Sequence, residues 1–381
     1  GEYTCLEIAQ AIARGQNFAG ISGSACLCNG LIIKGAPREP LNLNDLPFFD
    51  YSLLDIEMYI SKNRSDVGGK NLKTGPLRRS LPILSGLGCP YTCAFCVESI
   101  LKKKYRTRSA EQLIEEIKKI IRLYAINDVT FVDDLFFADK KRLLSFMDLL
   151  EQEKIHISWA TSVRANYFQD NYLNPALLKR LRRLGCFHLA LGAESGSERI
   201  LAKIDKQISR DDLLRASSWC KQTDINMGFS FMIGLPGETK EEMKRTISFA
   251  FQLVKDNPNS YIIGPNAFRP YPGSKLYDEC VREYGFQIPE KLDDWKKVFS
   301  REEGFYKLED LPWVKDPEFI RILSFYLFRG TTNYTYNNFF AREGSRILKK
   351  LCRLRLKTNF FGIAFEFFMM NHLRSVLCND H

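Results

Sequence analysis

Short apolar runs alternate with stretches that carry apolar side chains at helical spacing, from Leu81 to about Tyr284. The short runs are typical of buried strands, and the longer periodic stretches are typical of amphipathic helices. Parallel strands joined by right-handed helical crossovers curl into a barrel. The expected fold class is therefore α/β, with a six-unit partial TIM-like barrel. The predicted strands cover residues 81–84, 129–132, 155–163, 188–191, 227–233 and 261–268.

Several of the predicted helices carry clear start and stop signals. Ser109, with Gln112 three residues later, predicts a capped helix start. Asn174-Pro175 opens another helix with proline at its first position, and Gly185 ends it. Further helices are expected over residues 140–152, 211–222 and 239–254.

The pattern before the barrel begins with a predicted helix over residues 2–15. Thr4 is the expected N-cap, Glu7 is its capping-box partner, and Gly15 is the stop.

A hairpin and a linker follow this helix. Residues 18–27 and 31–34 are the predicted strands, and Asn29-Gly30 is the turn between them. One helix and one hairpin cannot bury a core of their own. We therefore interpret this part as the tail of a larger domain, and the start at Gly1 without Met as that of a fragment. The expected domains are residues 1–49 for this tail and linker, 50–288 for the barrel and 289–381 for a C-terminal segment.

The C-terminal segment is expected to be helical and aromatic. Trp295 and Trp313 lie in an irregular stretch that either covers the barrel mouth or packs on the barrel. Seven basic residues crowd between Arg342 and Lys357, and the apolar run 360–370 follows them. Basic charge beside apolar side chains is typical of a helix lying on an anionic membrane surface. A helix packed on the barrel with a solvated basic face would show the same pattern.

Composition limits the class of protein. The net charge of +10 comes from that local basic stretch, which argues against nucleic acid as a partner. Eleven cysteines do not form a disulfide framework, and no apolar run is long enough to cross a membrane. We expect a cytoplasmic protein, with a peripheral contact at the inner face of the membrane through residues 342–370.

Candidate chemistry centres on Cys89, Cys93 and Cys96, which follow the first predicted strand on a loop. Thiolates this close together suit an iron–sulfur cluster. With three protein ligands, one iron of a 4Fe–4S cubane stays open to a cofactor. A structural zinc ion would need a fourth Cys or His, and the nearest histidine is His156. Three buried structural thiols are the other alternative.

The cysteine spacing, with Phe95 just before the last cysteine, resembles the signature of the radical S-adenosylmethionine (SAM) enzymes. The resemblance covers about Leu81 to Tyr284. It implies that these cysteines are both metal ligands and catalytic residues, and that the open iron chelates SAM. One electron would then cleave SAM to a 5'-deoxyadenosyl radical.

The N-terminal part resembles the end of the cobalamin-binding domain in the cobalamin-dependent branch of that family. This implies a remnant of a doubly wound domain, and cobalamin as a cofactor of the full-length protein. An unrelated N-terminal cap on the barrel, which would need no cofactor, is the alternative. The matching residues are Gly1-Glu2, Thr4, Gly15, Ile21-Ser-Gly23, Asn29-Gly30, Arg38 and Leu46-Pro47.

Polar residues follow the C-terminal ends of the predicted strands, where barrel active sites lie. The resemblance implies that Phe95 and the turn at Gly234 contact adenine, and that Arg164 and Glu194 bind the ribose or the carboxylate of SAM. It gives Lys206 the role of a cation for that carboxylate. A structural ion pair, or a plain helix start at Gly234, would explain the same residues. The expected cofactor-binding residues are Phe95, Asp133, Arg164, Glu194, Ser195, Lys206 and Gly234.

The expected function is that of a radical SAM enzyme performing methyl transfer or a rearrangement on an unidentified small-molecule or lipid-like substrate. Flavodoxin or ferredoxin would supply electrons. A radical SAM methylthiotransferase or tRNA-modifying relative is one alternative, although no second cysteine triad is visible. A non-catalytic electron-transfer protein is another, but it would normally offer four cysteines to its cluster.

Overall fold

The computed structural model describes residues 1–62, 78–101, 104–299, 301–302, 305–332 and 339–378. The chain forms two compact units, Gly1–Leu46 and Pro47–His381. Residues 63–77, which we assigned to the barrel, and 379–381, which we assigned to the C-terminal segment, lie outside the described residues.

The first unit holds helix α1 (Glu2–Ala13), the hairpin strands β1 (Ala25–Cys28) and β2 (Leu31–Lys34), and the 3₁₀ turn η1 (Leu43–Asp45). The hairpin turns at Asn29-Gly30 as predicted, and Cys28 pairs with Leu31. The first strand is shorter than predicted. Gly20 and Gly23 both have positive φ, which interrupts an extended strand before Ala25.

The predicted cap of α1 is wrong, because the helix begins at Glu2 with no side-chain cap. The Thr4 hydroxyl instead donates to the carbonyl oxygen of Ser22 at 2.9 Å. Glu7 pairs with Arg38 rather than with the helix start. Both side chains therefore tie later segments of this unit to the helix.

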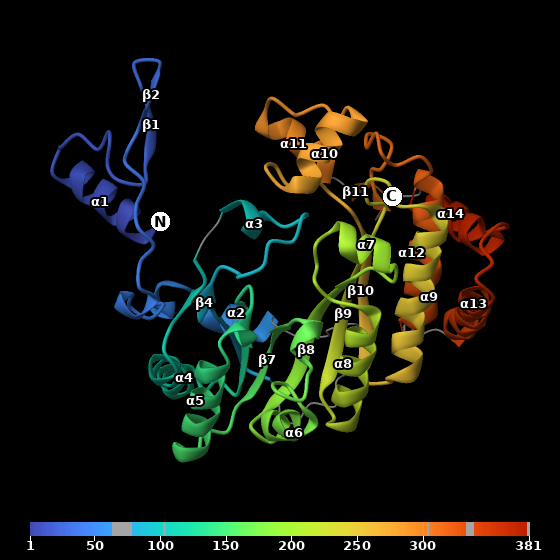
Figure 1. Ribbon diagram of the computed structural model, residues 1–381, viewed down its shortest axis with the longest axis horizontal. Helices are drawn as coiled ribbons and strands as arrows, with labels where there is room; N and C mark the ends of the chain where they lie inside the picture. The colour runs from blue at the N-terminus through green and yellow to red at the C-terminus, as the bar shows by residue number, and fades with distance from the viewer. Residues whose placement is uncertain (63–77, 102–103, 300, 303–304, 333–338, 379–381) are drawn as a thin grey trace. The chain divides into compact units, whose positions relative to one another are not determined.

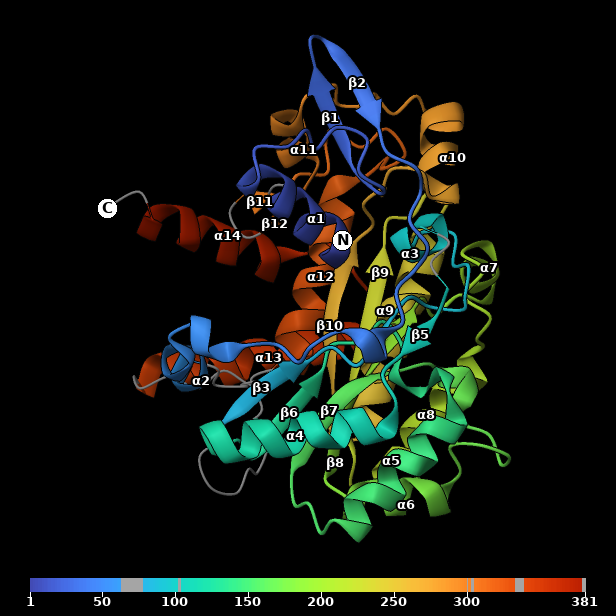
Figure 2. The same cartoon turned by 90° about the vertical axis from the view of Figure 1, so that its left-hand side faces the viewer.

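The second unit is built on a six-stranded parallel sheet with the order β10-β9-β8-β7-β6-β3 (Figures 1 and 2). The chain order of the strands is thus their spatial order, as expected for successive strand–helix units. Within the described residues the pairing runs from β10 to β3 without closing, which confirms the predicted α/β partial barrel. The strands are β3 (Ser80–Ile83), β6 (Asp128–Phe131), β7 (Ser158–Val163), β8 (Cys186–Glu194), β9 (Asn226–Ile233) and β10 (Ser260–Ala267).

Helices cover one face of this sheet (Figures 1 and 2). The Ser109 hydroxyl accepts from the Gln112 amide and so starts the helix after β3, as predicted. Apolar side chains of these helices pack with the strands in one continuous core. The covering helices are α4 (Ala110–Tyr124), α5 (Lys140–Gln152), α6 (Pro175–Arg183), α8 (Arg210–Gln222) and α9 (Lys240–Asp256). Helix α7 (Glu198–Lys203) follows β8 and helix α10 (Lys275–Tyr284) follows β10, and both lie past the C-terminal ends of the strands (Figures 1 and 2).

Smaller elements precede the barrel or connect its strands and helices. They are η2 (Tyr51–Leu53), α2 (Ile56–Lys62), β4 (Gly86–Leu87), α3 (Val97–Leu101), β5 (Arg106–Thr107), η4 (Phe136–Ala138) and η5 (Ala165–Tyr167).

The C-terminal segment is helical, as predicted. The Trp313 indole is buried and donates to the Gly234 carbonyl oxygen at 3.0 Å. No helix among the described residues is long and apolar enough to cross a membrane. The elements are α11 (Leu292–Phe299), β11 (Arg301–Glu302), β12 (Phe305–Tyr306), α12 (Pro317–Thr331), α13 (Phe339–Thr358) and α14 (Phe365–Cys378).

His188 is a buried titratable group inside the sheet, where its Nε2 lies 2.9 Å from the Tyr261 hydroxyl. Burial lowers the pKa of His188 from 6.5 to about 4. Between these values the unfolded chain binds a proton that the folded chain does not, so stability falls as the pH falls through this window. The loss reaches about 3 kcal/mol at pH 4, at about 1.4 kcal/mol per pKa unit.

We expect His188→Gln to reduce this acid sensitivity of the free energy of unfolding, measured by urea denaturation between pH 7 and pH 4. His156→Gln is the control, because His156 is exposed. An unchanged slope in His188→Gln would contradict a neutral buried imidazole.

Candidate functional site

The three cysteines lie on the loop that connects β4 to α3. Cys93 is buried, and Cys89 and Cys96 are partly exposed. The Gly88 amide donates to the Asp134 carboxylate at 2.9 Å. The end of β6 therefore fixes the point at which the cysteine loop starts.

Backbone hydrogen bonds hold the middle of this loop from two further elements. The Ala94 amide donates to the Ile204 carbonyl oxygen just after α7, at 2.8 Å. The Leu276 amide in α10 donates to the Ala94 carbonyl oxygen at 3.0 Å. The loop position is thus set by distant parts of the barrel rather than by the loop alone.

Arg164 follows β7, and its side chain contacts the cysteine loop. Its guanidinium lies 3.5 Å from the centre of the Tyr91 ring, and its Nη1 is 3.6 Å from Cys93 Sγ. Its Nη2 donates to the Lys206 carbonyl oxygen. Burial raises the pKa of the Cys89 thiol, while the charge of Arg164 acts in the opposite direction. Arg164 therefore favours the thiolate form that a metal cluster requires.

Lys206 and Glu194 form a buried ion pair beside the loop, with Nζ and Oε1 2.6 Å apart. Glu194 has a φ of 60°, which turns the chain sharply at the end of β8. A Cβ on Gly192 would lie 2.8 Å from Lys206 Nζ, so glycine makes room for the pair. The ammonium also lies 5.5 Å from the centre of the Phe95 ring.

Asp133 binds the segment that leads into the cysteine loop. Its carboxylate accepts from the amide and the hydroxyl of Ser85, both at 2.6 Å. Arg142 Nη1 lies 4.0 Å away. Burial raises the pKa of the Asp133 carboxyl. These partners lie just after β3 and in the first turn of α5.

Ser195 and Gly234 have protein partners of their own. The buried Ser195 hydroxyl lies 3.1 Å from the Thr246 hydroxyl in α9. The Gly234 amide donates to Glu238 at 2.7 Å, and burial raises the pKa of Glu238 to about 7. These contacts shape the turns after β8 and β9.

The structure therefore connects part of the predicted set and separates the rest. Phe95, Arg164, Glu194 and Lys206 form a chain of contacts with the cysteine loop. Asp133, Ser195 and Gly234 instead form hydrogen bonds with Ser85, Thr246 and Glu238, in the turns that follow the strands. Sequence reasoning missed Tyr91, although an aromatic residue inside the cysteine motif was a visible signal.

The donor set consists of three thiols on one loop, which is a set of ligands that suits an iron–sulfur cluster. Within the described part of the chain, no three His, Cys, Asp or Glu side chains are placed to hold one metal ion. The ligands of a cubane bind different irons and need not converge on one point. Three thiols near Arg164 and Lys206 suit thiolate ligation of a cubane, with one iron left for another ligand.

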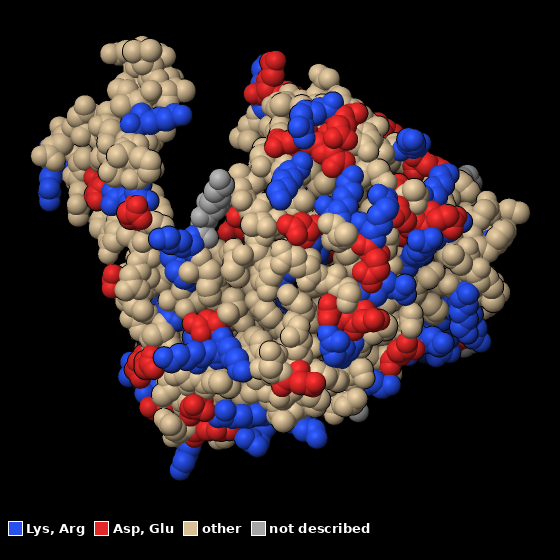
Figure 3. All heavy atoms as spheres, in the orientation of Figure 1, with Lys and Arg blue, Asp and Glu red and all other residues tan. Residues whose placement is uncertain are grey.

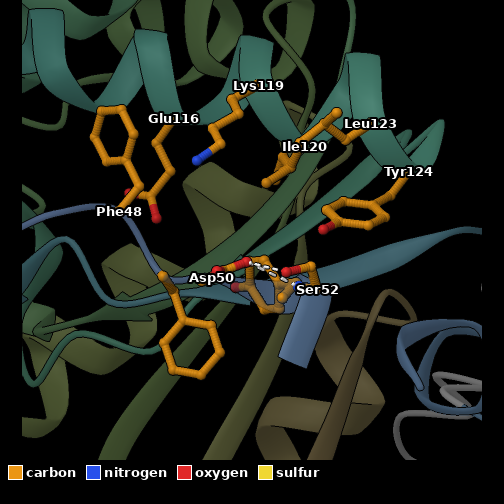
Figure 4. Close-up of a pocket in the computed structure, with 10 residues that line it drawn as sticks. Phe48, Asp50, Ser52, Glu116, Lys119, Ile120, Leu123 and Tyr124 are labelled. Carbon is orange, nitrogen blue, oxygen red and sulfur yellow. Dashed lines mark hydrogen bonds between the residues drawn. The ribbon is translucent and has the colours of Figure 1, made fainter. Parts of the chain in front are cut away.

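A hollow lies on the outside of the barrel, between α4 and residues 48–52 (Figure 4). Its volume is about 320 Å³. Glu116 and Lys119 enter it from α4, and Phe48 lies against them. Burial raises the pKa of Glu116, and Arg108 lies 3.9 Å from its carboxylate. This hollow involves none of the predicted site residues.

Comparison with known proteins identifies a family for most of the sheet. Residues 83–250 match the sequence model of the radical SAM superfamily. Uncharacterized methyltransferase PH0819 of Pyrococcus horikoshii is 32% identical over 283 residues, which are 74% of this chain and 56% of that protein. The anaerobic magnesium-protoporphyrin IX monomethyl ester cyclase of Rubrivivax gelatinosus is 24% identical over 84% of this chain and 58% of its own length. The chain thus spans a little over half the length of these relatives.

Solved structures show the same fold. One is the radical SAM methyltransferase TsrM of Kitasatospora setae, solved with tryptophan and a SAM analogue. It has a TM-score of 0.60 at 17% sequence identity, and the match covers 99% of this chain and 76% of the TsrM chain. The cobalamin-dependent enzyme OxsB has a TM-score of 0.60 at 15% identity, covering 86% of this chain and 49% of its own.

Proposed function

Because this chain belongs to the radical SAM superfamily, we propose that Cys89, Cys93 and Cys96 hold a 4Fe–4S cluster at which SAM is cleaved. In this family the bound cluster supplies one electron to SAM, which yields methionine and a 5'-deoxyadenosyl radical. The observation that carries the proposal is the placement of three thiols on one loop beside the cations Arg164 and Lys206.

The chain's own residues would bind and orient SAM. We assign the face of Phe95 to the adenine and the charge of Lys206 to the methionine carboxylate. Lys206 is already held by Glu194 at 2.6 Å, so the pair would present one cation in a fixed position. Charge-assisted hydrogen bonds of this kind are stronger than neutral ones. Arg164, which contacts both Cys93 Sγ and the Lys206 carbonyl oxygen, would fix the position of Cys93 relative to Lys206.

The test is anaerobic reconstitution with iron and sulfide, reduction with dithionite, and chromatographic measurement of 5'-deoxyadenosine. We expect the product to depend on the reductant, the cluster and SAM together. Formation of 5'-deoxyadenosine without iron would contradict the proposal.

We further propose methyl transfer or a rearrangement on an unactivated carbon of a small molecule, with cobalamin as a second cofactor of the full-length protein. PH0819 is named a methyltransferase, and OxsB is a cobalamin-dependent enzyme. The order of α1 and the hairpin before the barrel supports this branch of the family.

Titration of hydroxocobalamin, followed by corrin absorbance, tests this part. We expect weak binding or none by residues 1–381, because the described part of Gly1–Leu46 holds no parallel sheet on which a corrin could rest. Tight stoichiometric binding by this chain would show that the corrin site is elsewhere.

We also propose peripheral membrane contact through residues 342–370. Ile347 and Leu354 on α13 are 61% and 56% exposed, and Ile363 and Phe365 near the start of α14 are 69% and 65% exposed. Large apolar side chains beside basic ones favour the surface of an anionic bilayer. Flotation should recover the protein with anionic vesicles and not with neutral ones. Equal recovery with both, or with neither, would refute the contact.

A further inference from the structure

A basic pocket lies where the C-terminal ends of α9 and α12 meet the side of α13. Its volume is about 450 Å³. Four basic side chains line it, and within the described residues its wall contains no acidic one. In Figure 3, basic side chains gather at the lower right, over α13. The four basic residues, which we call the basic pocket residues, are Lys255, Lys349, Arg353 and Lys357.

Three of them recur at every fourth position of α13, which places them on one helix face. Two of these are fixed by the end of α12. Lys349 Nζ donates to the Thr332 carbonyl oxygen, and Arg353 Nε donates to the Gly330 carbonyl oxygen, both at 3.0 Å. Lys357 and, from α9, Lys255 complete the wall. Hydrogen bonds to the end of α12 therefore hold two of the four basic side chains in place.

Positive charge predominates among the residues that line the pocket. Each helix C-terminus contributes roughly half a negative charge, so the ends of α9 and α12 together bring about one negative charge to a wall with four basic residues. Like charges held around one hollow repel each other, and a compact anion would relieve that repulsion. Phosphate esters are compact and multiply charged, and they are bound by Lys and Arg side chains.

The remaining wall is formed by the apolar Phe251, Val254 and Pro258 together with Gly330 and Thr331. A ligand that fits both parts has a charged head and a less polar body. On an adjoining face of α13, the exposed Ile347, Leu351 and Leu354 form an apolar stripe. We propose that the pocket binds the phosphate group of a phosphate ester, either a phospholipid headgroup or a soluble phosphorylated compound. This deepens the membrane contact proposed above and is independent of the cluster.

The test uses calorimetric titration with glycerol 3-phosphate, and cosedimentation with vesicles of phosphatidylglycerol or of phosphatidylcholine. We expect binding of at least one anionic probe. In Lys255→Gln/Lys357→Gln this binding should weaken at least about tenfold, since each basic group near an anionic surface contributes about 1 kcal/mol. These two lysines are chosen because Lys349 and Arg353 make the backbone hydrogen bonds to α12.

Lys141→Gln/Lys179→Gln is the matched control, which removes the same charge from exposed positions of α5 and α6. Binding to phosphatidylglycerol vesicles alone would identify a lipid headgroup, and binding of glycerol 3-phosphate would identify a soluble ester. No binding of either probe, or equal weakening in the two double variants, would overturn the proposal. Formation of 5'-deoxyadenosine should be the same in all these variants, so failure here leaves the cluster proposal standing.

Discussion

Cys93→Ala is expected to lower the iron content of the reconstituted protein from about four irons per chain to near zero. Cys93 is the buried member of the three cysteines, and the amides and carbonyls around it fix the loop. Without its thiolate two ligands remain, too few to retain a cubane. Formation of 5'-deoxyadenosine should fall to the level of the cluster-free protein. Iron counting and electron paramagnetic resonance measure the first effect, and chromatography measures the second.

Cys186→Ala is the matched control, since it also removes a buried thiol but lies in β8, outside the cysteine loop. Its iron content should stay at the parent value. A full cluster in the variant lacking all three loop cysteines would show that other thiols are the ligands. Cys26 and Cys28, whose sulfurs are 3.5 Å apart, would then be examined first.

Lys206→Ala is expected to lower the free energy of unfolding of the cluster-free protein by about 3 to 5 kcal/mol, because removal of one partner leaves a buried charge uncompensated. The side chains of Lys206 and Glu194 are only 11% and 8% exposed. In Glu194→Gln/Lys206→Met both charges are gone, and most of the stability should return. Urea denaturation measures these differences. SAM binding to the reconstituted double variant should still be weak, which separates the role in binding from the role in folding.

Lys203→Ala provides the comparison. Lys203 pairs with Glu279 at the same distance of 2.6 Å, but these side chains are 22% and 19% exposed. More solvent screens this pair, so its loss should cost about 1 kcal/mol or less. If Lys206→Ala cost no more than Lys203→Ala, burial of the Lys206–Glu194 pair would not be what makes its loss costly.

The order of the elements was predictable because each strand contains a short, mostly apolar run and the longer helices carry apolar side chains at helical spacing. Lys140–Gln152 forms a helix with the predicted bounds, and Ser109 caps its helix. The first strand of the hairpin was predicted too long, because Gly20 and Gly23 adopt a positive φ that apolar patterning does not reveal. Helix α7 was missed because its six residues are too short for a clear period.

The site was predictable only through the rule that active sites of such barrels lie at the C-terminal ends of the strands. The rule placed Arg164 and Glu194 near the cysteines, but it did not identify the side chains that contact them. The contact of Arg164 with Tyr91 joins two loops, and the pair of Glu194 with Lys206 needs a left-handed turn at Glu194. Gly192, two residues earlier, was the available signal of close packing. Ser195 and Gly234 could not be told apart from Arg164 by sequence, since all three follow strands.

The hydrogen bonds at Ala94 have a consequence for the order of biosynthesis. Ala94 is held by Ile204 and by Leu276, and Leu276 leaves the ribosome long after the cysteines do. The cysteine loop can therefore reach its final form only when α10 has left the ribosome. We expect nascent chains from which α10 has not yet emerged to leave the three thiols open to alkylation, and chains from which it has emerged to protect Cys93. Delivery of iron and sulfur would then be a late event, after translation of the barrel.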